Sequence, residues 1–412
     1  MEKVYDKCCG IDVHKKIIVA CFVYGRKQEI KEFGATTREL LELSDWLQKG
    51  GCEIAAMEST GSYWKPLYNI LESVGLKAIV VNAQHMKAVP GRKTDVKDAE
   101  WIADLLRHGL LKASYIPSKE QRELRELVGY RKSLVADKTR ELNRLQKMLE
   151  GANIKLSGTV SSIDGKSARN ILKLLVQGEK IDVRKLEELK KQKVIASNLK
   201  ASYEQLAEDL NGVMTKLQRQ MMKELISHID ELDQHIENLN EQIDDHMNPD
   251  EKKAVNEIKK VTGIGEDGAK AIVAVIGTDM DRFPTDAHLA SWAGLCPGNN
   301  ESAKKRRSGK TTKGNKLLRT TLVVCAHAAV KVKSSYFYAQ FKRISAHRGK
   351  KRAYVAVAHS MLIAIYPILK DGIEFEDLGS EYYNQFNKER KINAYLKKLK
   401  NLGWELPTTI MA

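Results

Sequence analysis

The sequence predicts an α/β domain at the N-terminus, followed by a chain that is mostly helical. Short apolar runs alternate with helical patterns over about the first 110 residues, as expected for a mixed sheet covered by helices. Leucine and isoleucine then recur at three- and four-residue steps among charged residues, which is typical of long amphipathic helices. Charged residues make up 30% of the chain and aromatic residues only 6%, so aliphatic side chains must fill the cores.

Five apolar runs are expected to form the sheet. The first three read as consecutive antiparallel strands, with a hairpin turn at Gly25 and Arg26 between the second and third. The last two are short and fully apolar, as buried strands are, and they alternate with helical patterns. The expected strands are 5–13, 16–23, 29–33, 52–57 and 76–82, and the expected helices are 37–49, 63–74 and 96–111.

Four acidic residues stand at the ends of these elements. Asp12 and Glu58 follow strand-like runs, and Asp95 and Asp98 open a helical pattern at a spacing that puts both on one helix face. Grouped carboxylates repel one another unless a cation neutralises them, and hard oxygen ligands suit Mg²⁺. Two such ions can hold the attacking and leaving oxygens of a phosphate. Taken singly, Asp12 also fits an ordinary turn, and Asp95 and Asp98 fit a helix N-cap with Glu100.

The net charge of +16 and the pI near 9.3 favour a polyanionic partner, either nucleic acid or an anionic membrane surface. No run of about 18 apolar residues predicts a membrane span. The charged N-terminus does not have the pattern of a signal peptide. Six cysteines form no CxxC pair, and most lie in apolar runs, so we expect core thiols of a reducing cytoplasm.

The middle of the chain predicts a coiled-coil arm. Heptad-like leucines occupy 119–150, a Gly- and Ser-rich break covers 151–169, and a second apolar stripe runs through 206–243 until Pro249 ends it. Whether this stripe pairs within the chain or with a partner subunit stays open. Further on, the glycines at 263–265 fit either a tight turn or a phosphate cradle. Helices are expected at 317–332 and 352–369, and the tail from 370 has no assigned role.

A basic, glycine-bearing loop spans 297–315. Over 299–319, eight of 21 residues are Lys or Arg, and Glu301 is the only acid. Such a cluster neutralises phosphates, so we expect a nucleic-acid contact from Lys304, Lys305, Arg306, Arg307, Lys310, Lys313 and Arg319. Two serines, Ser302 and Ser308, lie among these cations, which favour a serine alkoxide and hence a nucleophile. A second basic group runs from Lys342 to Arg352.

Six motifs occur in an order that resembles one family. They are Gly-Ile-Asp-Val-His-Lys (10–15), Glu-Ser-Thr-Gly-Ser-Tyr (58–63), Lys-Thr-Asp-Val-Lys-Asp-Ala (93–99), Val-Thr-Gly-Ile-Gly (261–265), Ala-Gly-Leu-Cys-Pro (293–297) and Lys-Gly-Asn-Lys-Leu-Leu-Arg (313–319). Together they look like the DEDD transposases of bacterial insertion sequences, whose best-known members are guided by a bridge RNA. The resemblance implies a RuvC-like ribonuclease H domain (1–115), a coiled-coil dimerisation region (116–250), a helical transposase domain (251–370) and a tail (371–412).

The resemblance also implies the roles of single residues. Asp12, Glu58, Asp95 and Asp98 would bind Mg²⁺, and Ser302, which follows Glu301, would form a covalent phosphoserine bond with DNA. The family usually has glycine where this chain has Ala303, which leaves Ser308 as the alternative nucleophile.

The implied partners are donor and target DNA, a bridge RNA and further copies of the chain, as a dimer and a synaptic tetramer, in the bacterial cytoplasm at the nucleoid. A metal-dependent junction nuclease of ribonuclease H fold, which forms no covalent intermediate, is the alternative function. A binding protein that has lost its activity is a third possibility, but it would gain nothing from four clustered carboxylates.

Overall fold

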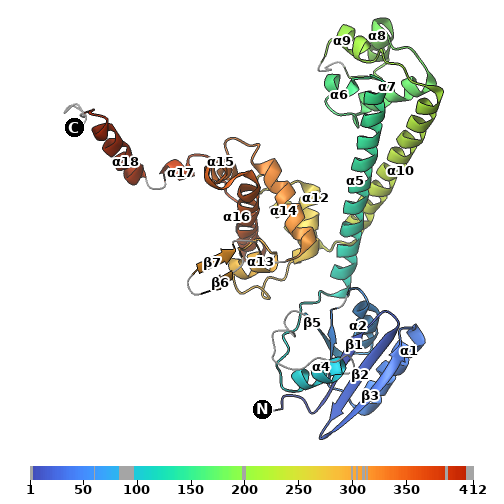
Figure 1. Cartoon of the computed structure of the whole chain (residues 1–412), viewed down its shortest axis with the longest axis vertical. Helices are drawn as coiled ribbons and strands as arrows, with labels where there is room; N and C mark the ends of the chain where they lie inside the picture. The colour runs from blue at the N-terminus through green and yellow to red at the C-terminus, as the bar shows by residue number, and fades with distance from the viewer. Residues whose placement is uncertain are drawn as a thin grey trace. The chain divides into compact units, whose positions relative to one another are not determined.

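The computed structural model describes residues 3–59, 61–82, 97–196, 201–297, 300–302, 305–308, 311, 314–385 and 388–404. These residues form two compact units, Met1–Ser118 and Lys119–Ala412. Figure 1 shows the elements of each unit.

A five-stranded mixed sheet forms the centre of the first unit. Its order is β3-β2-β1-β4-β5; the first three strands are antiparallel neighbours, while β4 pairs in parallel with both β1 and β5. This topology is the ribonuclease H-like arrangement that the resemblance implied. The strands are β1 (Lys7–Val13), β2 (Ile17–Tyr24), β3 (Lys27–Gly34), β4 (Ile54–Glu58) and β5 (Lys77–Val81).

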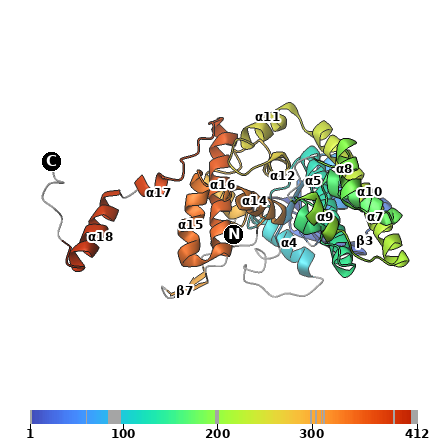
Figure 2. The same cartoon turned by 90° about the horizontal axis from the view of Figure 1, so that it is seen from above.

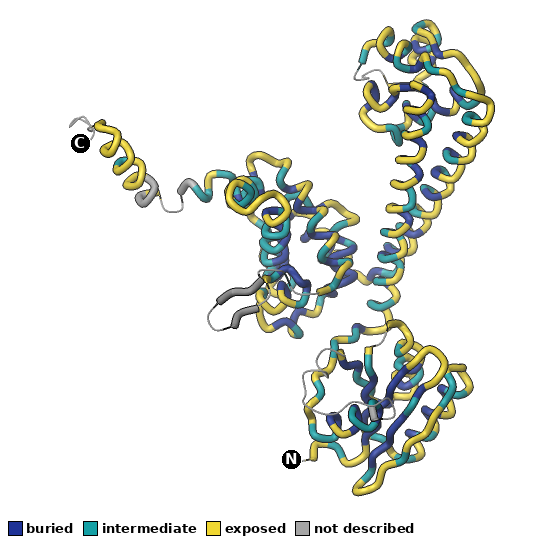
Figure 3. Tube along the Cα trace, viewed as in Figure 1, coloured by how far each residue is buried: buried dark blue, intermediate teal, exposed yellow. Residues whose placement is uncertain are grey.

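Helices cover both faces of this sheet, so its central strands are buried, as Figure 3 shows. Two helices, α1 (Thr37–Gly50) and α2 (Trp64–Ser73), pack on the face that carries Ile11 and Met57. Helix α4 (Lys97–Arg107) packs on the opposite face, which carries Cys8 and Ala56. The strands and helices expected here from the sequence are confirmed, with ends that differ by a few residues.

Two long helices of the second unit, α5 (Lys119–Gly151) and α10 (Lys216–His246), pack side by side and run antiparallel. Three contacts between the helices show this direction: Glu123 with His246, Lys138 with Asp233, and Glu141 with His228. Residue numbers rise along α5 in the direction in which they fall along α10. Leu134, Leu232 and Leu239 are buried between them. The apolar face of α10 is therefore covered within the same chain over this length.

The prediction of one continuous stripe from 206 to 243 is wrong at its start. Leu206 and Leu210 belong to a small helical domain at the far end of α5 and α10, while Val213 and Leu217 are 83% and 65% exposed. The chain leaves the helical conformation after Asp209 and re-enters it at Lys216, where Thr215 forms a capping box with Gln218. The sequence analysis missed this domain, whose helices are α6 (Leu156–Thr159), α7 (Lys166–Gln177), α8 (Val183–Lys191) and α9 (Tyr203–Asp209).

The C-terminal part of the second unit is a helical domain around one apolar core. Helix α16 (Lys350–Asp371) packs against α11 (Pro249–Ile258), α13 (Asp286–Trp292), α14 (Lys316–Ala329) and α15 (Tyr336–Arg348). By length and composition α16 could cross a membrane, but its position in this core is that of a core helix in a folded domain. The other helices are α12 (Glu266–Ile276), α17 (Tyr382–Gln385) and α18 (Lys388–Asn401).

The basic segment expected to be a loop contains a small hairpin instead. Strands β6 (Asn300–Ser302) and β7 (Lys305–Ser308) pair antiparallel, with an irregularity between Asn300 and Glu301. The sequence analysis also missed α15, whose apolar residues do not form a regular stripe.

Candidate functional site: an acidic edge of the sheet

Asp12 lies near the end of β1 and is buried, with 5% of its surface exposed. Side chains alternate along a strand, so Asp12 shares a face with Cys8 and Gly10, which is the face covered by α4. Its carboxylate oxygen Oδ2 lies 3.0 Å from Nε2 of His14, whose side chain is 60% exposed. A buried carboxylate is stable only when a cation or hydrogen-bond donors compensate its charge, and His14 is one such partner.

Glu58 is the last residue of β4 and is half-buried. In the parallel pairing of β1 with β4, Ile11 lies opposite Met57, so Asp12 and Glu58 are the next residues along two neighbouring strands. Glu58 shares its strand face with Ile54 and Ala56, and both of these belong to the core beneath α4. The two acids therefore lie at the same edge and on the same face of the sheet.

Asp98 reaches this edge because α4 runs antiparallel to β1. The carbonyl of Arg107, at the end of α4, accepts hydrogen bonds from the amides of Val4 and Tyr5, which precede β1. Near the other end of the helix, the backbone of Ala99 and Ala103 lies against Gly10. Asp98, in the first turn of α4, is consequently at the carboxyl end of β1, and it is half-buried.

Gly10 allows this close approach of helix and strand. A Cβ atom at this position would lie 2.2 Å from the amide nitrogen of Ala103 and 2.3 Å from the carbonyl oxygen of Ala99. Both neighbours are backbone atoms, which cannot rotate away. The glycine therefore sets the depth at which α4 holds Asp98 over the sheet.

Asp95 lies outside the described residues. Among the residues that the structure describes, no group of three or more His, Cys, Asp or Glu side chains is close enough to hold a metal ion. The donors at this edge, Asp12, Glu58 and Asp98, are nevertheless hard oxygen ligands of the kind that Mg²⁺ takes. Their chemistry fits a divalent cation, which these three residues could help to hold.

His14 is a functional candidate to which the sequence analysis gave no role, and the structure places it against Asp12. A spacing of two along an extended chain puts both side chains on one face. That spacing from Asp12 was the signal that could have identified the contact.

The two candidate serines lie at opposite ends of the β6–β7 hairpin. Ser302 pairs with Lys305 beside the turn, whereas Ser308 pairs with Asn300 at the base. Of the predicted nucleic-acid contacts, Lys305, Arg306 and Arg307 are in β7, and Arg319 is half-buried in α14. Lys304, Lys310 and Lys313 lie outside the described residues.

The glycine turn before α12 is a packing device. Gly263 has a φ of +89°, and a Cβ there would lie 2.4 Å from the amide nitrogen of Ala329. The first turn of α12 carries two acids: Glu266 binds Lys259 and Lys270, and Asp267 binds Arg131. Two carboxylates in the first turn repel a phosphate electrostatically, so the tight-turn interpretation is favoured.

Comparisons with known proteins cover most of the chain. A family model described as a transposase, that of the DEDD transposases of the IS110 type, matches residues 9–154. A second model, described as the transposase IS116/IS110/IS902 family, matches residues 255–342.

The chain is also similar to individual proteins. A transposase for an insertion sequence element of Coxiella burnetii is 23% identical over 375 residues, which cover 88% of this chain and 89% of the relative. A pilin gene-inverting protein of Moraxella lacunata is 22% identical, over 91% of this chain and 98% of the relative. The solved structure of T. thermophilus RuvC in complex with a Holliday junction substrate matches 27% of this chain, at 12% identity and a TM-score of 0.21.

Proposed function

This chain belongs to the IS110 family of DEDD transposases, and from that premise we propose that it cuts and rejoins DNA with Mg²⁺ held by Asp12, Glu58, Asp95 and Asp98 and with Ser302 as nucleophile. As a transposase it is an enzyme that acts on DNA strands. The observation that supports the acidic site most strongly is that Asp12 and Glu58 lie at the carboxyl ends of neighbouring strands, on the sheet face covered by α4, whose first turn carries Asp98.

Each proposed group has a definite task. When bound, the divalent cation would neutralise the carboxylates and the charge that develops on the scissile phosphate. The buried carboxylate of Asp12 is oriented by His14, which limits its freedom to rotate. Asp98 is held at a fixed depth by the close contact of α4 with Gly10.

The serine step conserves the phosphodiester. The Oγ atom of Ser302 would form a bond to phosphorus while one bridging P–O bond of the backbone breaks, and the departing sugar oxygen would take up a proton. A sugar hydroxyl of a second strand could then displace the serine and restore the phosphodiester. Such an exchange, rather than simple hydrolysis, is what rearranging a DNA segment requires, and the similarity to a pilin gene-inverting protein is consistent with it.

Guidance by a bridge RNA and assembly into a dimer and a synaptic tetramer form the rest of the proposal. The net charge of +16 supports the binding of both DNA and RNA, because both are polyanions. The resemblance to bridge-RNA-guided members is what suggests the RNA.

A covalent-trapping assay tests the chemistry. The protein, Mg²⁺, the RNA from the element's flank and labelled donor and target DNA are mixed and separated on a denaturing gel. We expect a protein–DNA adduct that Ser302→Ala abolishes and Ser308→Ala retains. Cleavage without an adduct in any variant would favour a hydrolytic junction nuclease instead, and loss only in Ser308→Ala would move the nucleophile to the base of the hairpin.

Substitutions of the acids test the other half of the site. Asp12→Asn and Asp98→Asn should each slow strand cleavage by more than the roughly 10–100-fold typical of outer-shell metal partners. Asp104→Asn is the matched control, because this residue lies on α4 beyond Ala103, is 60% exposed and pairs with His108. Normal cleavage by Asp12→Asn would contradict the assignment of the acidic site.

A further inference from the structure

The stretch from Ser302 to Lys370 contains 17 Lys or Arg and no Asp or Glu. Eight of these cations fall within 304–319 of the sequence, and a second group gathers where α15 ends and α16 begins. We call this group the α15–α16 corner and define it as Arg348, Lys350, Lys351 and Arg352. Helices α15 and α16 pack side by side, as Figure 2 shows, and only Gly349 separates them in sequence.

The four cations of the corner are exposed. Within the described part of the chain, none of them lies within 4 Å of a carboxylate. Other cations of the same unit form ion pairs with carboxylates. Lys270 binds both Asp244 and Glu266, and Lys260 binds Glu257 and Glu374. The corner therefore presents positive charge that the described protein does not neutralise.

This charge does not serve the stability of α16. The first turn of α16 contains three cations and no acid, and no side chain caps it. Cations at a helix N-terminus are unfavourable, because the amides there already carry partial positive charge. A local arrangement that opposes folding is common where a sequence also has to bind a partner.

The corner is held by a rigid aromatic contact. Tyr354, one turn into α16, stacks on His327 of α14 with 3.5 Å between ring centroids and also contacts Phe341 of α15. The cations thus project from elements whose positions are fixed, which lowers the entropic cost of binding an extended polyanion.

We propose that the α15–α16 corner binds the sugar–phosphate backbone of nucleic acid, as a contact separate from the hairpin. An anionic membrane surface is the weaker match, because membrane-bound helices expose an apolar face, whereas Ala353 and Val357 of α16 are buried in the core. The corner lies beyond residue 342, where the second family match ends. The inference depends neither on a guide RNA nor on Ser302.

Salt-dependent binding of the full chain tests the proposal. The corner variant replaces Arg348, Lys350, Lys351 and Arg352 with Gln. The matched control replaces four exposed lysines of α5, α8 and α10 with Gln as well, so both variants lose four positive charges. These lysines are Lys147, Lys191, Lys216 and Lys223. The probes are a short duplex of arbitrary sequence, a single-stranded RNA and vesicles that contain an anionic lipid.

We expect the corner variant to bind nucleic acid at least about tenfold more weakly than the control. Its plot of log K against log salt should flatten by about 0.9 for each lost phosphate contact with duplex DNA, up to about 3.6, or by about 0.7 for each contact with a single strand. The probe with the larger loss identifies the strand that the corner binds. The melting temperature should stay the same or rise, and an Arg348→Lys, Arg352→Lys variant should bind normally.

Equal affinity and equal salt slope in the corner variant and the control would overturn the proposal. So would a loss confined to the anionic vesicles. Neither result would bear on Ser302, because the adduct assay measures covalent chemistry and this assay measures reversible binding.

Discussion

Gly10 shows how one residue without a side chain can position the acidic edge of the sheet. Gly10→Ala would place a methyl group within 2.3 Å of two backbone atoms of α4. We expect the free energy of unfolding to fall by about 1–3 kcal/mol through overpacking, and strand cleavage to fall with it, because the helix that carries Asp98 must move. Urea denaturation and the cleavage assay measure the two effects.

Gly129→Ala is the control for this substitution. A Cβ at this position of α5 meets nothing within 4 Å, so replacing glycine in a helix should stabilise the protein by about 0.5–1 kcal/mol. Equal free energies of unfolding for Gly10→Ala and Gly129→Ala would mean that α4 can move away from β1 without loss of stability. That result would contradict the proposed role of Gly10.

At the level of residues, the sequence predicted more of the acidic edge than of the serine hairpin. Asp12 and Glu58 lie at the ends of strands with clear apolar runs, and parallel pairing of those strands aligns them. The closeness of α4 could not be predicted, because it depends on contacts between residues some 90 positions apart in sequence. The hairpin strands are only three and four residues long, and neither Asn-Glu-Ser nor the cationic Lys-Arg-Arg-Ser has a strand pattern.

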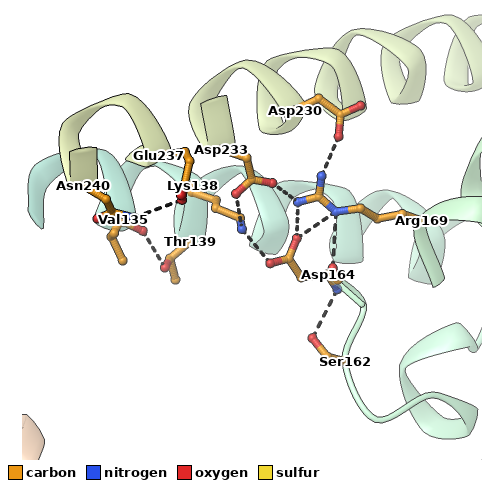
Figure 4. Close-up of polar contacts among 10 residues, drawn as sticks. All are labelled: Val135, Lys138, Thr139, Ser162, Asp164, Arg169, Asp230, Asp233, Glu237 and Asn240. Atoms are coloured by element: carbon orange, nitrogen blue, oxygen red, sulfur yellow. Dashed lines mark hydrogen bonds and ion pairs between the residues drawn. The ribbon is translucent and has the colours of Figure 1, made fainter. Parts of the chain in front are cut away.

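At the level of elements, an ion-pair cluster joins the small helical domain to α5 and α10. Arg169 of α7 binds Asp164 in the preceding loop and Asp230 and Asp233 of α10, while Lys138 of α5 also binds Asp164 at 2.7 Å and Asp233 (Figure 4). Arg169 and Lys138 are each only 19% exposed. Such a network fixes the domain because each charge has more than one partner.

Arg169→Met should lower the free energy of unfolding by about 1–3 kcal/mol, since it leaves half-buried carboxylates with fewer partners. Urea denaturation at neutral pH measures this change. Lys173→Met is the control, because Lys173 is 53% exposed and contacts only the edge of the cluster at Asp230, so its effect should stay within about 0.5 kcal/mol. If both variants unfold alike, the cluster is not what holds the domain in place.

The same cluster predicts a pH dependence. Burial alone would raise the pKa of Asp164, but the hydrogen bonds and charges of Lys138 and Arg169 outweigh it and hold the pKa below its ordinary value. Its stabilisation is therefore complete above the unfolded pKa of about 3.9 and is lost as the pH falls through the folded value. In Arg169→Met, the free energy of unfolding should fall less as the pH is lowered. Denaturation curves recorded between neutral and acidic pH would measure this difference.

The elements that the sequence predicted poorly share a physical cause. Residues 206–217 have helical spacing, yet the chain bends between α9 and α10, and only the burial of Leu206 and Leu210 in a separate core explains where each helix ends. Helix α15 is only weakly amphipathic, and aromatic contacts with Tyr354 of α16 and with Tyr383 stabilise it instead. Tertiary packing determines where these helices begin and end, and the spacing of apolar residues along the sequence does not reveal that packing.

At the scale of the whole molecule, the division into two compact units predicts separable behaviour. The first unit, Met1–Ser118, has a sheet with both faces covered and its own apolar cores. A domain with its own core can fold alone, so a fragment of residues 1–118 should unfold in one cooperative transition. This fragment contains all four proposed metal ligands and lacks Ser302.

With this fragment, metal binding can therefore be measured separately from the proposed serine chemistry. Binding to the folded state alone stabilises by about 1.4 kcal/mol at ten times the dissociation constant, which raises the melting temperature of a domain of this size by roughly 6 °C. We expect Mg²⁺ to produce such a shift, and we expect Asp12→Asn to abolish it. Without metal, Asp12→Asn should melt at a higher temperature than the unsubstituted fragment, because it removes one of several carboxylates that repel one another. Identical shifts in the two fragments would show that the cation binds elsewhere, whatever the adduct assay finds for Ser302.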